Sequence, residues 1–251
     1  MKVLKVLGDY CSTGSIYTVS VQELANAVLS INPSMAALRT LATSLAKSSD
    51  PCSVVRSWMS RAMDMRNKVV ERARVFIRSR VVTTISRSSA VRDAIIKHVP
   101  KKVYILESRP GDEALQLYRE LASEGIIAEI VPDSCIARAV AASDMVVIGA
   151  DAVTIDGWVL NKVGSRPLAM VSKFLGKPFI VLCESLKLYH GSCSELELRT
   201  RWRYRVAKDM EVEVNVFECI EPDLVTYLVT DLGVFKPTRE CMELLASQVE
   251  H

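Results

Sequence analysis

A carboxylate, an amide and an amine follow a strongly apolar segment in the middle of the chain. Residues 145–148 are all apolar, Asp151 comes soon after them, and Asn161 and Lys162 follow in the next polar turn. An apolar strand that ends at a carboxylate, with a lysine and a glycine-bearing helix start close behind, is typical of an anion-binding pocket in an open α/β sheet. The segment therefore predicts a ligand site as well as a fold.

Two further loops place polar groups after apolar strands. Residues 86–89 read Ser-Arg-Ser-Ser, and residues 107–111 read Glu-Ser-Arg-Pro-Gly. Serine hydroxyls and free backbone N–H groups ahead of a helix can bind a phosphate, and Arg109 can add a bidentate contact. Because the carboxyl ends of parallel strands meet at one edge of a sheet, we expect these loops and Asp151 to converge.

Each of these residues also has a purely structural interpretation. Ser88 can be only the N-cap of a helix, Arg109 can pair with Glu107, and Asp151 can stabilise its own turn. These alternatives stay open for each residue taken alone. The convergence of all three loops on one edge is what favours a site.

Short apolar strands alternate with helix-length segments from residue 81 onward. Such alternation predicts βαβ units and a mainly parallel sheet with right-handed crossovers. We predict an α/β protein in which a helical N-terminal domain, residues 1–80, precedes a Rossmann-like domain, residues 81–251, with helices on both faces of its sheet. The predicted strands are Val81–Ile85, Val103–Leu106, Ile127–Val131, Met145–Ile148 and Phe179–Cys183.

The first 80 residues read as helices. Val21–Leu29 and Ala36–Ala46 are rich in Ala, Leu and Ser, and the proline between them ends the first helix. A third, long helix is predicted over residues 50–80. Asp50 supplies its N-cap acceptor and Pro51 its first helical position.

Charge is distributed unevenly, although the formal net charge is only +3. Residues 1–80 carry 12 Lys/Arg and 5 Asp/Glu (12 − 5 = +7), and the remainder carries 20 and 24 (20 − 24 = −4). Much of the basic excess lies in the helix predicted over residues 50–80. A solvated helix face is the simplest interpretation, and a surface for RNA or an acidic partner is the alternative.

Composition bounds the class of protein. The chain has 251 residues, no apolar run long enough to span a membrane, and a start too short for a signal peptide, so we expect a soluble, cytoplasmic protein. Its seven cysteines are scattered and show no metal-ligand spacing with the three histidines. We therefore expect separate reduced thiols, no metal and no cofactor.

An ordered set of motifs resembles the translation initiation factor 2B alpha/beta/delta family. That family includes the archaeal ribose-1,5-bisphosphate isomerases and the methylthioribose-1-phosphate isomerases. The resemblance covers residues 81–245 well and the helical part loosely. Its motifs are Glu107–Pro110, Gly149–Ala152, Asp156–Gly157, Asn161–Gly164, Leu168–Ala169, Lys177–Phe179 and the tail Phe217–Pro237.

The family's catalytic thiol has no counterpart in this chain. In the isomerases a Thr-His-Cys-Asn loop after the first strand of the sheet supplies a cysteine that is paired with the aspartate of the Gly-Ala-Asp motif, here Asp151. The matching stretch is Thr84–Ser89, so Ser86 stands at the cysteine position and Ile85 at the histidine position. A thiol exchanges protons near neutral pH, whereas an unaided serine hydroxyl does not. A base would have to come from a distant residue such as His190.

Two phosphate-binding arginines of the isomerases are also replaced. Thr13 precedes Gly14 where the family has an arginine, and Asn32 occupies the arginine position of its Arg-Pro-Thr-Ala element. Losing two such contacts removes about 1.5–3 kcal/mol each. The ligand-binding positions that the resemblance and the loops together imply are Gly14, Ser15, Ser86, Ser88, Arg109, Asp151, Asn161 and Lys162, with Asp151 as the catalytic residue if the chain is active.

The resemblance implies a noncatalytic regulatory subunit, similar to initiation factor 2B and of archaeal type, that binds a phosphorylated sugar or a nucleotide. Initiation factor 2 components or family paralogues are the expected partners, together with a homodimer through the Rossmann-like domain. An exposed apolar patch on a predicted tail helix, Asp223–Leu228, would support the dimer. The alternatives are a sugar-phosphate isomerase, such as one that converts ribose 1,5-bisphosphate to ribulose 1,5-bisphosphate, and a protein that acts mainly through RNA.

Overall fold

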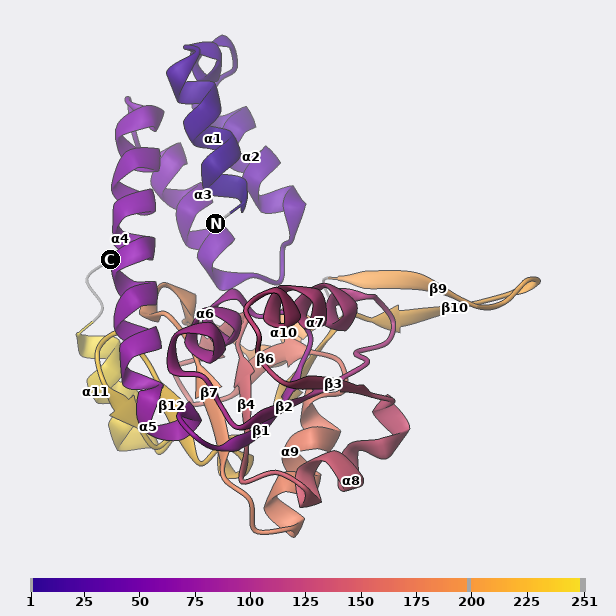
Figure 1. Cartoon of the computed structure of the whole chain (residues 1–251). Helices are drawn as coiled ribbons and strands as arrows, with labels where there is room; N and C mark the ends of the chain where they lie inside the picture. Colours follow the sequence, from indigo (N-terminus) through magenta and orange to yellow (C-terminus); the bar gives the residue numbers. More distant parts are fainter. Residues whose placement is uncertain (1, 198–199, 249–251) are drawn as a thin grey trace.

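A seven-stranded sheet lies at the centre of the computed structural model, which describes residues 2–197 and 200–248 (Figure 1). The strand order is β13-β12-β7-β4-β1-β2-β3, and only the β12–β13 pair is antiparallel. The strands are β1 (Val81–Ile85), β2 (Lys102–Leu106), β3 (Ala128–Val131), β4 (Met145–Gly149), β7 (Phe179–Leu182), β12 (Tyr227–Val229) and β13 (Val234–Phe235). The five predicted strands are confirmed, each to within one residue at either end.

The strand order reverses direction at the β1–β4 pair. From β1 the chain builds outward through β2 and β3, then returns to the other side of β1 and continues through β4, β7 and β12. β1 and β4 are neighbours, with Val82 opposite Met145. An open α/β sheet binds ligands outside the carboxyl ends of its strands at such a switch point.

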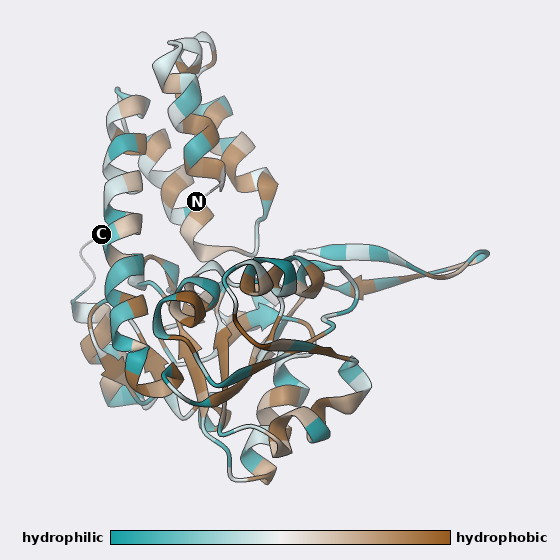
Figure 2. Cartoon of the chain, in the orientation of Figure 1, coloured by the Kyte–Doolittle hydropathy of each residue, from teal (hydrophilic) through white to brown (hydrophobic). Residues whose placement is uncertain are grey.

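Helices cover both faces of the sheet, as predicted. One face packs against α6 (Ser89–His98) and α7 (Glu113–Ser123), and the other against α8 (Ile136–Ala141), α9 (Ser165–Phe174) and α11 (Arg239–Ser247). Alternate residues of β4 point to opposite cores: Val147 lies in the first and Val146 in the second. The sheet is correspondingly apolar in Figure 2, because both of its faces are buried.

Four helices stand above one end of the sheet (Figure 1). They are α1 (Lys2–Ser12), α2 (Val21–Ile31), α3 (Ala36–Ala46) and α4 (Pro51–Arg72), with a 3-10 turn, η1 (Ser15–Thr18), after the first. Ser20 and Glu23 form a capping box at the start of α2, and Asp50 caps α4 by accepting from the N–H groups of Cys52 and Ser53. Local sequence signals therefore set where both helices begin.

The helix predicted over residues 50–80 is shorter than expected. It ends at Arg72 and is followed by a single turn, α5 (Arg74–Ile77). No glycine or proline marks this end, but Ala73 and Ile77 are completely buried in the core of the sheet. Tertiary packing therefore ends the helix where the local sequence would continue it.

α4 joins the helical part to the sheet. Its first half contributes Val55 and Trp58 to the core of the helical part, and its second half contributes Val69 and Val70 to a core of the sheet. Its basic residues are not all solvated, because Arg66 is turned inward. Exposed arginines remain beyond it, and an RNA or acidic-partner surface there stays a prediction.

A smaller sheet and a long hairpin complete the fold. The four-stranded sheet has the order β11-β6-β5-β8 and extends from the carboxyl edge of the main sheet. Its strands are β5 (Ala152–Thr154), β6 (Val159–Lys162), β8 (Leu188–Tyr189) and β11 (Phe217–Ile220), and the hairpin strands are β9 (Arg201–Ala207) and β10 (Met210–Asn215). The remaining short elements are η2 (Asp133–Cys135), η3 (Ser185–Lys187), α10 (Cys193–Glu197) and η4 (Pro222–Leu224).

The predicted tail helix over residues 223–228 is wrong. The chain makes the short turn η4 and then enters the sheet as β12, parallel to β7, with Leu228 opposite Val181. Leu228 and Val225 are buried in the sheet core, and Leu224 packs against it, so the segment is not the exposed apolar helix that was predicted.

The prediction that all the cysteines are separate thiols is also wrong. Cys11 and Cys52 form a disulfide that joins α1 to α4, and Cys193 and Cys219 form another that joins α10 to β11. Each pair is brought together from positions 41 and 26 residues apart, respectively, which the sequence alone does not reveal. Cys135, Cys183 and Cys241 are free. No helix within residues 2–197 and 200–248 is long and apolar enough to cross a membrane.

Candidate functional site

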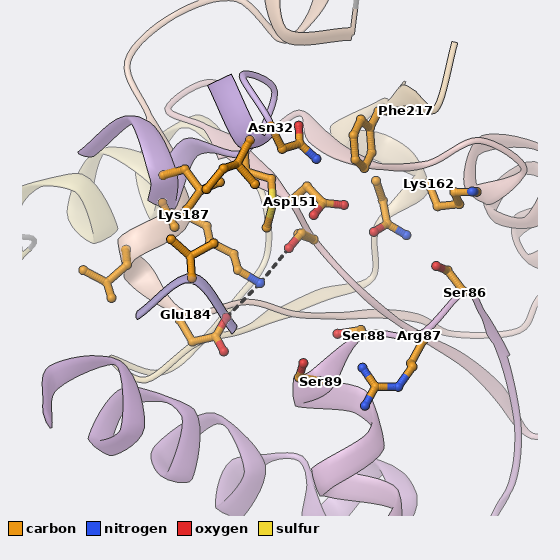
Figure 3. A pocket seen from close by; sticks show the side chains of 18 of the residues that line it. Asn32, Ser86, Arg87, Ser88, Ser89, Asp151, Lys162, Glu184, Lys187 and Phe217 are labelled. Atoms are coloured by element: carbon orange, nitrogen blue, oxygen red, sulfur yellow. Dashed lines mark hydrogen bonds and ion pairs between the residues drawn. The ribbon is translucent and has the colours of Figure 1, made fainter. Parts of the chain in front are cut away.

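A cavity of about 560 Å³ lies between the helical part and the carboxyl ends of β1 and β4. Ser86, Ser88 and Asp151 lie on its polar side, at the strand ends (Figure 3). Its apolar side is formed by side chains of α1, α3 and α4. The lining includes Leu4, Asn32, Met35, Leu38, Leu41, Trp58, Arg66, Ser86, Arg87, Ser88, Ser89, Glu113, Asp151, Asn161, Lys162, Glu184, Lys187, Trp202 and Phe217. The cavity therefore occupies the switch point of the sheet, where the strand order predicts a ligand.

The serine loop after β1 lies directly against the end of β4. Ser88 caps α6, with its hydroxyl accepting from the N–H of Val91. A Cβ built on Gly149 would lie 2.2 Å from Ser88 Oγ, so only glycine fits at the end of β4. The two strand ends can approach this closely because position 149 has no side chain.

Ser86 adopts a left-handed backbone conformation at the end of β1, with φ 60°. Its N–H donates to Ser108 Oγ at 2.7 Å, which ties the serine loop to the loop after β2. Ser86 itself lines the cavity. A non-glycine residue with positive φ is uncommon, and this one is held by the neighbouring loop at the candidate site.

Asp151 lines the same cavity from the end of the neighbouring strand. Its backbone N–H donates to Leu160 O at 2.8 Å and its carbonyl accepts from Ala36 N–H at 3.3 Å, so the chain is held on both sides. Burial raises the pKa of the Asp151 carboxyl to about 6, although the charges of Lys187 and Lys162 act to lower it. Within the described residues its carboxylate makes no hydrogen bond or ion pair, so this group is available to a ligand.

A buried charge cluster lies beside Asp151. Lys187 Nζ is 2.9 Å from the Glu184 carboxylate and donates to Ala150 O at 2.8 Å, while Arg66 pairs with Glu184 from α4. Burial alone would raise the pKa of Glu184, but the charges of Lys187 and Arg66 outweigh it and lower that pKa to about 2. Glu184 is therefore ionised at neutral pH and holds both cations beside the cavity.

Asn161 and Lys162 are the last two residues of β6, and both line the cavity. Asn161 Nδ2 donates to Ser165 Oγ at 2.8 Å, and Lys162 Nζ donates to Pro110 O at 2.6 Å and to Glu113 Oε1 at 3.0 Å. The Trp202 ring covers the same ammonium group. Lys162 is thus fully engaged by this chain.

The four cations that line the cavity in the described part of the chain all have carboxylate partners. Arg87 pairs with Glu120 at 2.7 Å, Lys162 with Glu113, and both Arg66 and Lys187 with Glu184. A charged ligand must therefore compete with existing ion pairs. In the described part of the chain, the groups on the polar side that remain available to a ligand are the hydroxyls of Ser86 and Ser89, the Asp151 carboxylate and the first N–H groups of α6.

The structure brings five of the eight candidate binding residues together and leaves three outside. Ser86, Ser88, Asp151, Asn161 and Lys162 line the cavity. Gly14 and Ser15 lie at the far end of α1 from Leu4, about 15 Å along the helix. Arg109 does not line the cavity, because its side chain turns outward and pairs with Glu107 at 2.6 Å.

No histidine or thiol takes the place of the missing cysteine among the described residues that line the cavity. His190 is exposed and does not line it, and His98 is buried with Nε2 2.7 Å from Val70 O. Cys183 follows β7 but is buried away from the cavity surface, and burial raises the pKa of its thiol well above the ordinary value. No group of three metal-ligating side chains occurs in residues 2–197 and 200–248.

Five charged residues that line the cavity are not among the residues predicted from the sequence: Arg66, Arg87, Glu113, Glu184 and Lys187. Arg66 is one arginine among many on α4, so nothing in the local sequence distinguishes it. Glu184 directly follows the predicted strand that became β7, and Lys187 lies three residues further on, at the end of η3. The strand-end rule applied to the serine loop would have found them, because they too leave the carboxyl edge of the sheet.

Comparison with known proteins decides the family. The model of the initiation factor 2 subunit family matches residues 17–237. The chain belongs to this family. A Pyrococcus furiosus relative, described as a putative translation initiation factor eIF-2B subunit 2-like protein, is 32% identical over 228 residues, which cover 87% of this chain and 82% of the relative.

Relatives of this family member include an enzyme. The ribose 1,5-bisphosphate isomerase of Methanocaldococcus jannaschii is 25% identical over 203 residues, which cover 68% of this chain and 66% of the isomerase. Among solved structures, the Pyrococcus horikoshii translation initiation factor eIF-2B superposes with a TM-score of 0.80 at 26% identity, over 88% of this chain and 83% of that one. The 5-methylthioribose 1-phosphate isomerase of the same organism shares the fold, with a TM-score of 0.68 at 17% identity, over 84% and 69% of the two chains.

Proposed function

We propose that this chain is a noncatalytic, regulatory member of the initiation factor 2 subunit family that binds a phosphorylated sugar or a nucleotide in the cavity between its helices and its sheet. The observation that carries the proposal is Ser86. It lines the cavity at the position where the isomerases of the family are expected to place their cysteine, one strand away from Asp151. An unactivated serine hydroxyl does not take over the proton transfers of a thiol.

The electrostatics of the cavity support the same proposal. Turnover of a phosphorylated sugar needs cations that are free to hold its phosphate, and here Arg66, Arg87, Lys162 and Lys187 are each paired with a carboxylate. A ligand that is bound but not turned over can be held by the serine loop, residues 86–89, and by the N–H groups at the start of α6. Initiation factor 2 components or family paralogues are the partners we propose for such a sensor.

The alternative is a sugar-phosphate isomerase. It is favoured by the isomerases among the relatives and by the raised pKa of Asp151, which suits proton exchange near neutral pH. Asn161 and Lys162 also line the cavity in the positions that the family resemblance implies. If the chain is an isomerase, Asp151 would exchange protons with the substrate together with a group other than a thiol.

An enzyme-coupled assay and a thermal-shift measurement on the same purified protein separate the two. Ribose 1,5-bisphosphate, methylthioribose 1-phosphate and AMP would be offered in turn. We expect a rise in melting temperature with at least one of them and no turnover with any. Robust wild-type turnover that Asp151→Asn abolishes would overturn the proposal.

Substitution of Ser86 provides the matched test. Ser86→Cys restores the thiol that the family resemblance implies, and Ser86→Ala is its control of similar size without a thiol. Isomerase activity that appears only in Ser86→Cys would support a lost-catalyst origin for a regulatory protein. Measurable turnover that is equal in wild type and Ser86→Ala would overturn the proposal, because it would show catalysis that does not need the residue at position 86.

A further inference from the structure

Two segments at the amino edge of the main sheet carry positive charge and no negative charge. Residues 72–80, which contain α5 and lead into β1, have four arginines, and residues 97–102, which lead into β2, have three lysines. Because both segments precede parallel strands, they lie at the end of the sheet away from the cavity and the helical part (Figure 1). They therefore form a surface that the candidate site does not use.

Backbone hydrogen bonds bring the two segments together. Lys101 N–H donates to Arg80 O at 2.7 Å, and Arg78 N–H donates to Arg74 O at 3.1 Å. The side chains of Arg74, Arg78, Arg80 and Lys101 are all exposed. We call these four residues the basic patch. Its cations come from two separate segments and lie on one surface because the starts of β1 and β2 are neighbours in the sheet.

No carboxylate among the described residues pairs with the basic patch. The lysines beside it differ in this respect, since Lys97 and Lys102 each have a glutamate partner. Asp144, which precedes the neighbouring strand β4, uses its Oδ2 atom to accept from the Val81 N–H at 2.8 Å. Cations that lie close together without counter-charges repel one another, and a bound anion relieves that repulsion.

A strained backbone holds the basic patch in place. Ser79 and Val99 both adopt left-handed conformations, with φ 59° and 44°, and Ser79 N–H donates to Val99 O at 3.5 Å. Val99 directly follows α6, at a position that glycine normally occupies. A β-branched residue with positive φ is rare, and strained residues of this kind cluster where ligands are held. Val99 is 59% exposed, so burial of its side chain does not account for its conformation.

The chemistry of the surface favours phosphate groups over a folded protein partner. The core of a protein interface is rich in aromatic and apolar side chains, whereas the exposed large apolar side chains in the two segments are only those of Val75 and Val99. Contacts to a nucleic-acid backbone need cations and no apolar pocket. Three of the four cations are arginines, whose planar guanidinium groups bind phosphate bidentately.

Among nucleic acids, a double-stranded RNA suits this surface best. Single strands are usually bound by stacking on aromatic side chains, but Phe76, the aromatic residue of the two segments, packs against Tyr227 with ring centroids 5.8 Å apart. Reading DNA in the major groove needs a helix or a ribbon that enters it, and α5 has only four residues. An RNA duplex is bound largely by its shape and its phosphates.

We propose that the basic patch binds the phosphate backbone of double-stranded RNA, without selecting its base sequence. The left-handed residues Ser79 and Val99 set the positions of the loops from which the cations project. The patch and the cavity lie at opposite ends of the sheet, so this binding does not depend on the ligand proposed for the cavity.

Fluorescence anisotropy with a labelled RNA duplex of about 16 base pairs tests the proposal. Arg78→Gln/Arg80→Gln removes two cations of the basic patch, and Arg61→Gln/Arg119→Gln removes the same charge from exposed, unpaired arginines outside it. We expect wild type to bind with a dissociation constant of about 1–100 µM near physiological salt. The patch variant should bind roughly tenfold more weakly, and its slope of log affinity against log salt should be flatter by about 2. The control should keep both the affinity and the slope.

Competitors identify the anion that the patch prefers. A DNA duplex of the same sequence and polyglutamate of equal charge would each be added to the RNA complex. Both should displace the RNA less effectively than unlabelled RNA duplex does. Polyglutamate that competes equally well would point to an acidic protein partner and overturn the proposal, and so would tighter binding of the DNA duplex. Absence of wild-type binding, or the same loss in the control variant, would overturn it as well.

Val99→Gly separates the role of the backbone from that of charge. Glycine adopts the left-handed conformation without strain, so the melting temperature should not fall. RNA affinity should nevertheless decrease several-fold, because the loop that carries Lys101 is no longer held in one conformation. Val99→Ala, which keeps a Cβ at this position, is the control and should bind RNA more tightly than Val99→Gly. Equal RNA affinity of wild type and Val99→Gly would overturn the proposed role of the strained loops.

Discussion

The indole ring of Trp202 lies over the ammonium group of Lys162, with Nζ 4.5 Å from the ring centroid. Trp202 begins the projecting hairpin, and Lys162 ends a strand of the smaller sheet. The contact joins the base of the β9–β10 hairpin to the rim of the cavity, beside the Glu113 carboxylate that also holds Lys162. A partly desolvated cation–π contact of this kind contributes about 0.5–2 kcal/mol.

Trp202→Ala should lower the free energy of unfolding by about 1 kcal/mol, because Lys162 loses the cation–π contact. Trp202→Phe is the control, since a phenyl ring keeps most of that interaction and should cost less. Urea unfolding monitored by circular dichroism measures both. Equal losses for the two variants would mean that the contact contributes packing rather than cation–π stabilisation.

Asp151→Asn should raise stability at pH 7.5 and have little effect near pH 4. Burial raises the folded-state pKa of Asp151 to about 6, above its ordinary value near 3.8, so the ionised carboxylate destabilises the folded state once the pH exceeds both values. The destabilisation develops between about pH 4 and pH 6 and is on the order of 1–3 kcal/mol. Melting temperatures of wild type and variant across this range check it. A difference that stays constant with pH would contradict the raised pKa.

Glu184→Gln should destabilise the fold by about 1.5–3 kcal/mol at pH 7, because it removes the carboxylate that the half-buried Arg66 and Lys187 share and leaves Arg66 with only Asp93, at 3.5 Å. The pKa of Glu184 is lowered to about 2, so its contribution is fully present above the ordinary glutamate pKa and is lost only as the pH falls toward 2. Chemical unfolding at pH 7 measures the loss. Glu243→Gln, which breaks the exposed pair with Arg239, is the control and should cost less than about 0.5 kcal/mol.

Gly149→Ala should cost about 1–3 kcal/mol, since the added Cβ would lie 2.2 Å from Ser88 Oγ and 2.5 Å from Ser88 Cβ. The double variant Gly149→Ala/Ser88→Gly removes both of those atoms and should recover most of the loss. Glycine at an N-cap costs only a few tenths of a kcal/mol, so Ser88→Gly alone is a mild control. Failure of the double variant to recover stability would place the strain somewhere other than the β1–β4 approach.

Much of the fold was predictable because its determinants are local. Periodic apolar runs predicted the five central strands, and Asp50 followed by Pro51 predicted the start of α4. The tail segment misled because Leu228 and its neighbours suit either a helix or a buried strand over so short a run. Pairing with β7 decided between the two.

The candidate site, too, was predictable in part: which residues lie near the cavity followed from the sequence, but the partners of their side chains did not. The rule that parallel strands present ligands at their carboxyl ends correctly assembled Ser86, Ser88, Asp151, Asn161 and Lys162 around one cavity. That rule says nothing about how a side chain is used. Arg109 follows a strand as predicted and yet turns outward to Glu107, because the neighbouring carboxylate is its nearest partner.

By itself the sequence determined the order of β1, β2, β3, β4 and β7, the serine at position 86 and the carboxylate at position 151, because these depend on residue type and on spacing along the chain. The tertiary structure alone decided that Arg66 reaches Glu184 from 118 residues away, that Cys11 joins Cys52, and that Trp202 covers Lys162. Such contacts depend on where distant segments meet in space. The local sequence does not predict such contacts, because the residues around an arginine or a cysteine are the same whether or not it has a tertiary partner.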